Sequence, residues 1–368
     1  MATLMGKPVD RPAVCFYEIN GLDESPDPTD PFNIYSHPSW HPLAALARQH
    51  SDRIVRRSVS FIGGQEPLSE HTRKQVWIED GVRFTRTVIN TARRTLTALT
   101  RQDPDVNTIW HVEHLLKDED DVRAFLEIPP AEIGKPDISG VLEAERMLGD
   151  TGIVMIDCAD PLCHAAELFH MADFTVIATT EPALFRALLD RFAAELYPRM
   201  EAIARALPGR LWRIVGPEYA SPPYLHPLQF HEYVTGYDTP LVRAIQAYGG
   251  YARIHCHGRI RLLLDEIAAT GCDGLDPIEP PPQGDIQLAE VRQRVGQQMV
   301  LFGNLESSDL ENLPAEDFRV LVQRAIDEGT RGSGRGFVLM PSACPYGRVL
   351  TERALRNYEV MIEAVGEF

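Results

Sequence analysis

The chain lacks the features of several broad protein classes. No apolar run in its 368 residues is long enough to cross a bilayer, so we expect no membrane span. Acidic residues outnumber basic ones by 53 to 36, which disfavours nucleic acid and anionic membrane surfaces as partners. Six cysteines are too few for a disulfide scaffold at this length. We therefore expect a globular cytoplasmic protein with reduced thiols.

From Gly152 onward, short apolar runs alternate with helical patterns. This alternation predicts parallel strands joined by crossover helices. The predicted strands are Ile153–Ile156, Leu211–Val215, Ala252–His255, Gly274–Ile278, Met299–Gly303 and Phe337–Met340. The predicted helices are Pro182–Ala206, Gln229–Tyr248, Ile260–Ala269, Leu288–Val295, Pro314–Glu328 and Arg353–Val365.

A barrel and an open doubly wound sheet both satisfy this alternation. The open sheet is expected to carry a glycine-rich phosphate turn after an early strand. The nearest candidate, residues 332–336, precedes a strand instead of opening a helix. The sequence therefore predicts an α/β fold, a (β/α)8 TIM barrel, as a single domain over residues 1–368.

The N-terminal third, residues 1–130, is predicted to hold irregular additions to the barrel. Arg11–Ile19 is interpreted as a strand, and Pro42–His50 and Asp118–Leu126 as helices. A small antiparallel sheet is predicted from three alternating segments, Arg53–Phe61, Gln75–Glu79 and Val82–Val88.

Polar residues recur where the predicted strands end. Barrel enzymes place their functional residues at the C-terminal ends of the strands, so these side chains are candidates for one site. They are Asp157, Glu218, Tyr219, His255, His257, Asp276, Glu279, Asn304 and Cys344.

The pair His255 and His257 is the most specific of these features. Residues two apart on a strand share a face, so both imidazoles point one way and Cys256 points the other. With Cys344 from a later strand they form a candidate catalytic zinc site, and Glu279 or Asp276 is a fourth ligand or a supporting partner. The alternative is a polar pocket in which the histidines act as acid–base groups.

Three other candidates carry an equally simple structural explanation. Glu218, in a proline-braced loop, either contacts substrate or caps the following helix. Asp157 and Asn304 are interpreted as pocket residues, with helix capping as the alternative for each.

Several segments together resemble the uroporphyrinogen decarboxylase superfamily. These are residues 6–12, Gly216-Pro217-Glu218-Tyr219 through Pro223, His255-Cys256-His257-Gly258, residues 274–280 and Gly303-Asn304-Leu305. The resemblance implies a (β/α)8 barrel and one of two chemistries. These are cofactor-free decarboxylation of a tetrapyrrole, and methyl transfer between a corrinoid or methylated donor and a thiol at a His–x–Cys…Cys zinc site.

The chain departs from both patterns. The stretch Cys15 to Leu22 has no arginine where the decarboxylases carry an arginine-rich loop, and it brings Glu18 instead. In the methyltransferase pattern, His255 and Cys344 match ligands, while His257 replaces the middle cysteine. The second branch is therefore the closer match.

The leading hypothesis is a zinc-dependent methyltransferase. Zinc would be held by His255, His257 and Cys344, with Glu279 nearby. The candidate catalytic groups are Glu218 and Asp157. A small-molecule substrate is expected to contact Tyr219, Asp276 and Asn304. Any corrinoid would sit on a separate protein, and the resemblance is compatible with a homodimer. The alternatives are a metal-free decarboxylase acting on a carboxylated substrate and a non-catalytic binding barrel.

Overall fold

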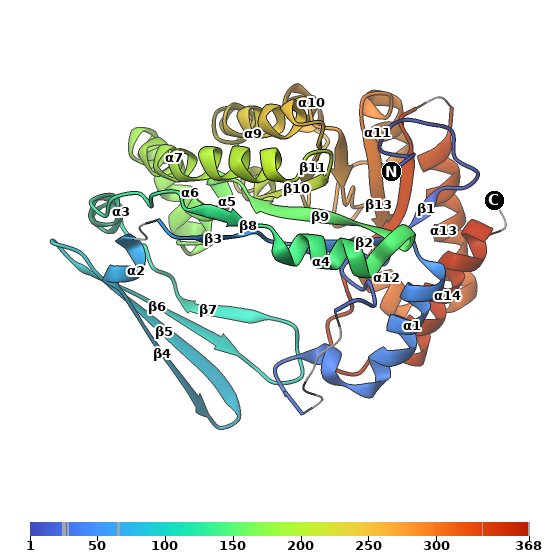
Figure 1. Cartoon of the computed structure of the whole chain (residues 1–368), viewed down its shortest axis with the longest axis horizontal. Helices are drawn as coiled ribbons and strands as arrows, with labels where there is room; N and C mark the ends of the chain where they lie inside the picture. Colours follow the sequence, from blue (N-terminus) through green and yellow to red (C-terminus); the bar gives the residue numbers. More distant parts are fainter. Residues whose placement is uncertain (24–26, 28, 65–66, 333, 367–368) are drawn as a thin grey trace.

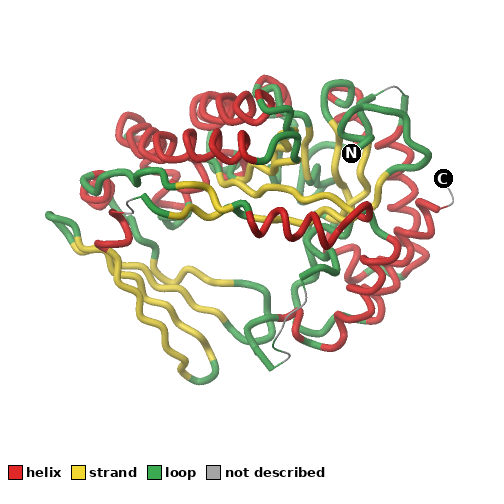
Figure 2. Tube along the Cα trace, viewed as in Figure 1, coloured by secondary structure: helices red, strands yellow, loops and turns green. Residues whose placement is uncertain are grey.

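Eight parallel strands form the centre of the molecule (Figures 1 and 2). The computed structural model describes residues 1–23, 27, 29–64, 67–332 and 334–366. The strands, in sheet order, are β1 (Ala13–Val14), β14 (Phe337–Pro341), β13 (Val300–Leu305), β12 (Gly274–Asp276), β11 (Tyr251–His255), β10 (Leu211–Val215), β9 (Gly152–Ala159) and β2 (Arg53–Arg57). Most of their residues are buried, as expected for strands that face a packed interior on one side and helices on the other.

Asp52 closes this sheet into a barrel by joining β2 to β1. Its backbone N–H donates to the Val14 carbonyl at 2.7 Å, and its carboxylate accepts from the Val14 N–H at 2.9 Å. The same carboxylate forms an ion pair with Arg11 at 2.7 Å. The predicted (β/α)8 barrel is thereby confirmed.

Helices surround the barrel. In chain order they begin with α1 (His41–His50), α2 (Pro67–His71), α3 (Glu119–Leu126), α4 (Ser139–Leu148), α5 (Pro161–Ala166), α6 (Met171–Thr180) and α7 (Pro182–Ala206). They continue with α8 (Pro227–Phe230), α9 (Gly236–Ala247), α10 (Leu264–Ala269), α11 (Leu288–Val295), α12 (Ser307–Asn312), α13 (Ala315–Thr330) and α14 (Glu352–Gly366). Among the described residues, no helix is both long and apolar enough to cross a membrane.

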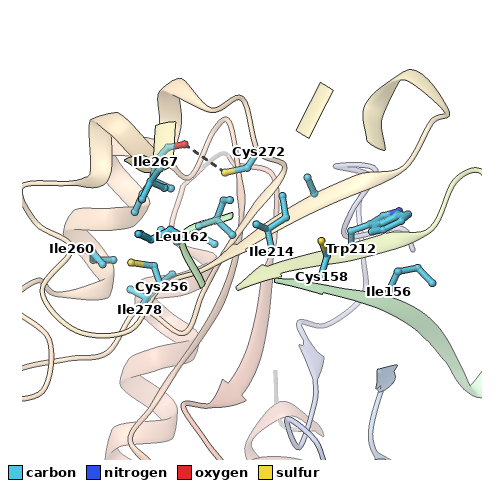
Figure 3. Packing of buried hydrophobic residues seen from close by; sticks show 14 of the residues in the cluster. Ile156, Cys158, Leu162, Trp212, Ile214, Cys256, Ile260, Ile267, Cys272 and Ile278 are labelled. Carbon is cyan, nitrogen blue, oxygen red and sulfur yellow. Dashed lines mark hydrogen bonds between the residues drawn. The ribbon is translucent and has the colours of Figure 1, made fainter. Parts of the chain in front are cut away.

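Apolar side chains fill two layers of this architecture. One lies between the strands and the helices, where Cys256 packs near Ile260 and Ile278 (Figure 3). The other occupies the barrel interior toward the N-terminal ends of the strands, and includes Cys15, Met155, Phe302 and Met340. Because this interior layer fills the lower half of the barrel, polar groups and ligand space are left to the C-terminal end.

A four-stranded antiparallel sheet projects from the barrel (Figure 1). Its strands are β4 (Thr72–Glu79), β5 (Val82–Asn90), β6 (Thr95–Gln102) and β7 (Ile109–Glu113). Only its root is fully buried, where Ile89 and Leu96 lie opposite each other in the register. A separate two-stranded sheet pairs β3 (Ser60–Ile62) with β8 (Lys135–Asp137).

The structure corrects the N-terminal predictions. Arg53–Phe61 is not part of the four-stranded sheet, because Arg53–Arg57 pairs in parallel with β9 as a barrel strand and Ser60–Ile62 pairs with β8. The predicted strand Arg11–Ile19 shortens to Ala13–Val14. These two strands belong to the barrel itself, so residues 1–130 are not made up of additions alone. The single predicted helix Gln229–Tyr248 is interrupted by a π-helical turn at His231–Thr235. Ser333, within the glycine-rich segment, lies outside the described residues.

The barrel closure makes the first prediction. Asp52→Ala removes the acceptor for Val14 and the partner of Arg11, and we expect the free energy of unfolding to fall by about 1–3 kcal/mol. Asp52→Asn keeps an acceptor oxygen but loses the charge, so its loss should be smaller. Urea unfolding followed by circular dichroism measures both, and equal losses would show that the Val14 contact contributes nothing.

Candidate functional site

Two arginines and two aspartates line the interior of the barrel above the apolar layer. Arg213 on β10 and Arg253 on β11 are partners in the sheet register, so they stand at one level. Arg213 donates to both oxygens of Asp157, at 2.7 and 3.1 Å, and to the Tyr17 hydroxyl at 3.0 Å. The guanidinium of Arg253 lies over the Phe302 ring at 4.8 Å, which places it directly on the apolar layer.

Asp276 connects this arginine layer to the histidines. It is completely buried, with one oxygen 2.9 Å from Arg253 Nε and the other 2.8 Å from His255 Nδ1. Burial alone would raise the pKa of Asp276, but the charges of Arg253 and His255 outweigh it and lower the pKa to about 2. The carboxylate is therefore ionised and fixes the orientation of His255.

His257 has the same arrangement one step further out. Its Nδ1 lies 2.7 Å from Glu279 Oε1, and the other Glu279 oxygen accepts from the Gly258 N–H at 2.6 Å. Burial tends to lower the pKa of His257, but the hydrogen bond and charge of Glu279 raise it overall. The two imidazole rings meet edge to face, with centroids 4.6 Å apart. Each ring thus has a carboxylate on Nδ1, so Nε2 is the nitrogen left for a ligand.

A cleft of about 420 Å³ opens beside these groups. His257, Glu279, Glu218 and Tyr219 all line it, together with Met171 at the start of α6. Four of the residues predicted from the strand ends therefore face one hollow at the C-terminal end of the barrel. We refer to it as the histidine cleft.

The turn that carries Glu218 is supported by buried acids. Glu218 accepts from the Gly216 N–H at 3.0 Å, so it braces its own turn, the 3-10 turn Pro217–Ala220, and not the following helix. Behind this turn lie Asp160 and Asp238, both fully buried. Burial and the neighbouring carboxyl group raise the pKa of Asp160 well above its usual range, and burial is the main cause of the same rise for Asp238. Because both pKa values are raised, the pair retains a proton at pH values at which an exposed acid is ionised.

Cys344 lies beside the N-terminal segment of the chain. Its thiol is partly buried next to Tyr35 and Glu18, and burial raises its pKa to about 12. Tyr35 and Glu18 line a second cleft of about 560 Å³, which also includes Trp40 and Arg56 and which we call the aromatic cleft. Across the described ranges, no group of three or more His, Cys, Asp or Glu side chains is arranged to hold a metal ion. The predicted zinc ligands are thus not assembled as one set, and zinc stays a prediction.

The remaining predicted residues keep their places at the strand ends. Asp157 lies on β9 and pairs with Arg213, not with a helix N-terminus; the residue that caps α5 is Asp160, which accepts from the Cys163 N–H at 2.5 Å. Asn304 is buried on β13 beside Met340 in the register.

Sequence reasoning missed the interior arginines. Arg213 and Arg253 each sit in the middle of a mainly apolar strand, Leu211–Val215 and Tyr251–His255. A charged residue at the same position of two successive buried strands is itself a signal, since burial of a charge is costly unless it is paired. Arg56 was missed because its strand was assigned to the wrong sheet. It bonds Glu18 at 2.5 Å and lies 3.7 Å from Asp157.

A comparison with protein families identifies the family of this chain. The family model for uroporphyrinogen decarboxylase (URO-D) matches residues 111–368. The chain belongs to the uroporphyrinogen decarboxylase family. The family match begins after β1, β2 and the first three strands of the projecting sheet, and it contains both histidines, both interior arginines and Cys344. No curated protein sequence matches the chain.

The fold is shared with a solved methyltransferase structure. A methyltransferase from Methanosarcina mazei superposes with a TM-score of 0.61 at 17% identity, over 100% of this chain and 97% of that one. A D-psicose 3-epimerase covers 63% of this chain and 92% of its own, at 10% identity and a TM-score of 0.33. A Bacteroides ovatus xyloglucanase covers 85% of this chain and 98% of its own, at 9% identity and a TM-score of 0.31. At 17% identity the likeness to the methyltransferase concerns the fold alone, and the two lower TM-scores support no argument.

The His257–Glu279 pair gives a second prediction. Glu279→Gln removes the hydrogen-bonded charge that contributes most to raising the pKa of His257 against burial, so that pKa should fall. Proton NMR of the imidazole during a pH titration measures the drop, which we expect to be about one unit or more. Glu266→Gln is the matched control because Glu266 pairs with the exposed His231. An unchanged His257 titration would refute the pairing.

The buried acids give a third prediction, about stability. The native state holds a proton on the Asp160–Asp238 pair that the unfolded state releases above the ordinary pKa of 3.8. An acid whose pKa is raised by folding stabilises the native state at low pH and loses that contribution as pH rises toward the folded pKa. Asp238→Asn cannot ionise, so its unfolding free energy should fall less steeply with pH, by up to about 1.4 kcal/mol per pH unit. Urea titrations across the neutral range test this, and parallel pH dependences would contradict the shared proton.

Proposed function

We propose that this chain is a zinc-dependent methyltransferase, which moves a methyl group from a corrinoid or other methylated donor to a thiol or another heteroatom. The donor, when a corrinoid, would be carried by a separate protein. The active site is the C-terminal end of the barrel, with the histidine cleft as the place of the acceptor. Membership of the family and the shared fold of the M. mazei methyltransferase support this proposal.

One observation carries the proposal. His255 and His257 each bond a carboxylate through Nδ1, and their rings meet at the mouth of the barrel. Histidines that bind metals characteristically donate the second ring nitrogen to a carboxylate, which fixes the tautomer and aims Nε2 at the metal. Acid–base histidines also use such pairs, but two adjacent rings oriented this way favour a metal.

The residues fit zinc in part. The two imidazoles have the required donor atoms and supporting carboxylates, while the third proposed ligand, Cys344, contacts Tyr35 and Glu18. Zinc held there would lower the pKa of a bound thiol, so that the acceptor reacts as a thiolate. The methyl carbon forms a bond to sulfur as its bond to the donor breaks, and the donor keeps the electron pair.

The chain's own side chains would position the reactants. Glu218, which lines the histidine cleft, is the carboxylate available to take the acceptor's proton. Tyr219 and Met171 form its less polar wall. The aromatic cleft, at the end of β1 and β2, is a second hollow at the same end of the barrel and gives room for a second reactant.

Decarboxylation of a highly anionic tetrapyrrole is the weaker alternative. Such a substrate needs several free cations, but three arginines on the barrel strands near the histidines already pair with carboxylates. Arg56 and Arg213 both form ion pairs with Asp157, and Arg253 forms an ion pair with Asp276. A polyanion would have to displace these carboxylates to bind.

Elemental analysis tests the metal. We expect close to one zinc per chain in the native protein, and a loss of at least about tenfold in its affinity for zinc after replacement of His257 and Cys344 together by alanine. His231→Ala is the matched control, since His231 also pairs with a carboxylate but is exposed. A native protein that binds no zinc even after incubation with it would overturn the zinc part of the proposal.

Activity assays separate the two chemistries. The native protein is incubated with methylcobalamin and a small thiol, and thioether formation is followed by mass spectrometry. Carbon dioxide release from a carboxylated tetrapyrrole is measured in parallel. Thioether formation that depends on His257 supports methyl transfer, whereas carbon dioxide release without thioether formation would favour the lyase.

A further inference from the structure

The outer strand of the projecting sheet presents an exposed edge. β4 is the terminal strand of the order β4-β5-β6-β7, and in Figure 1 it lies at the outer margin of the molecule. Val76 and Ile78 on this strand are 61% and 63% exposed. A long edge strand with exposed apolar side chains is a template for pairing with another chain, which proteins normally block or cover.

The hairpin geometry shows which backbone groups are free to pair. Glu79 and Val82 are register partners across a two-residue loop in which Asp80 and Gly81 have φ values of 51° and 80°. The two residues that flank such a loop exchange both of their backbone hydrogen bonds. Along an antiparallel pair, hydrogen-bonded residue pairs then alternate with pairs that make no such bonds. Residues 73, 75, 77 and 79 therefore bond to β5, while the N–H and C=O groups of 74, 76 and 78 point away from the sheet.

The side chains of β4 are complementary to themselves in one antiparallel register. When Val76 lies opposite Val76 of a second copy, residues at equal distances on either side of it pair. Arg73, three residues before, then faces Glu79, three residues after. In the same register Lys74 lies opposite Ile78, and all of these outward-pointing backbone groups meet partners. Shifting the two-fold axis to residue 75 or 77 keeps the backbone bonds but loses the Arg73–Glu79 pair.

We propose that β4 pairs with β4 of a second copy of this chain about a two-fold axis at Val76. The pairing turns the two four-stranded sheets into one continuous eight-stranded sheet. An isologous contact of this kind is self-limiting, because the same strand is used on both sides. It exchanges backbone hydrogen bonds between the two copies of Val76 and between Lys74 and Ile78.

Both faces of the joined sheet gain compatible contacts. On one face, Val76 meets its own copy, and the aliphatic stem of Lys74 covers Ile78. On the other face, two Arg73–Glu79 ion pairs flank Gln75 and Trp77. Trp77 is held in place by stacking on Phe84, with ring centroids 5.4 Å apart. Opposite charges directly across paired strands stabilise a sheet, and like charges destabilise it.

The occupant of the edge is a second copy because the complementarity lies within one strand. An unrelated peptide would satisfy the backbone groups equally well, but nothing would place an acid opposite Arg73 and a base opposite Glu79. The contact is small compared with obligate dimer interfaces, so we expect a reversible dimer whose population rises with concentration. This inference is independent of the proposed catalytic function, because β4 lies outside the barrel.

Charge reversal tests the register. Sedimentation velocity is measured over a concentration series for the native chain, Arg73→Glu, Glu79→Arg and the double variant with both changes. Each single change places like charges opposite each other twice, and we expect dimerisation to weaken by about tenfold or more. The double variant restores both ion pairs and should recover native association. Arg86→Glu, on the neighbouring strand β5, makes the same charge change away from the edge and is the control.

The outcomes decide the proposal. A native chain that stays monomeric at high concentration would overturn it. So would a dimer that neither single reversal weakens, since that dimer uses another surface. Circular dichroism confirms that each variant is folded, and recovery in the double variant excludes loss of folding as the cause. Val76→Cys should in addition cross-link to itself with a short thiol-reactive linker, in a yield above that of the native chain.

Discussion

The buried carboxylate of Asp276 is the interaction on which the centre of the molecule depends. It compensates the charge of Arg253, which rests on the apolar layer, and it orients His255, which faces the mouth. A lone arginine in this position would carry a desolvation cost of several kcal/mol, so neither partner is tolerable without the other. One carboxylate thus couples the packing of the barrel interior to the geometry of the site. The same logic repeats in Asp157 with Arg213 and in Glu279 with His257.

The C-terminal half of the fold is readable from the sequence because its signals are local. Each strand from Ile153 onward is a short, mainly apolar run, and each is followed by a helical pattern of apolar residues. The polar residues at the strand ends could be grouped from the sequence alone, because parallel strands bring their C-terminal ends to one edge of the sheet. The structure places Glu218, Tyr219, His257 and Glu279 around one cleft.

Other features depend on contacts that no local pattern carries. Residues 58–61 alternate as in a half-exposed strand, and only the pairing of Arg53–Arg57 with β9 shows that the start of this segment is a barrel strand. Cys344 matches a zinc ligand in a family pattern, yet its neighbours in space are Tyr35 and Glu18, which come from the other end of the chain. The Asp160–Asp238 pair joins a strand end to a helix 78 residues later. Pairings of this kind follow from the closed topology and become visible only once the barrel is built.

The shortness of β1 has a consequence for motion. Each of the other barrel strands has at least three residues, whereas β1 has two, and its contact with β2 rests on Asp52. Local opening events concentrate where backbone hydrogen bonds are few, so we expect the barrel to open transiently at this seam. Glu18 follows β1 and Arg56 belongs to β2, so they flank the seam, whereas β11 and β12, which hold His255 and Asp276, lie on the far wall. Fluctuation at the seam would therefore vary access to the aromatic cleft while the histidines keep their positions, which gives the enzyme one rigid wall and one compliant wall.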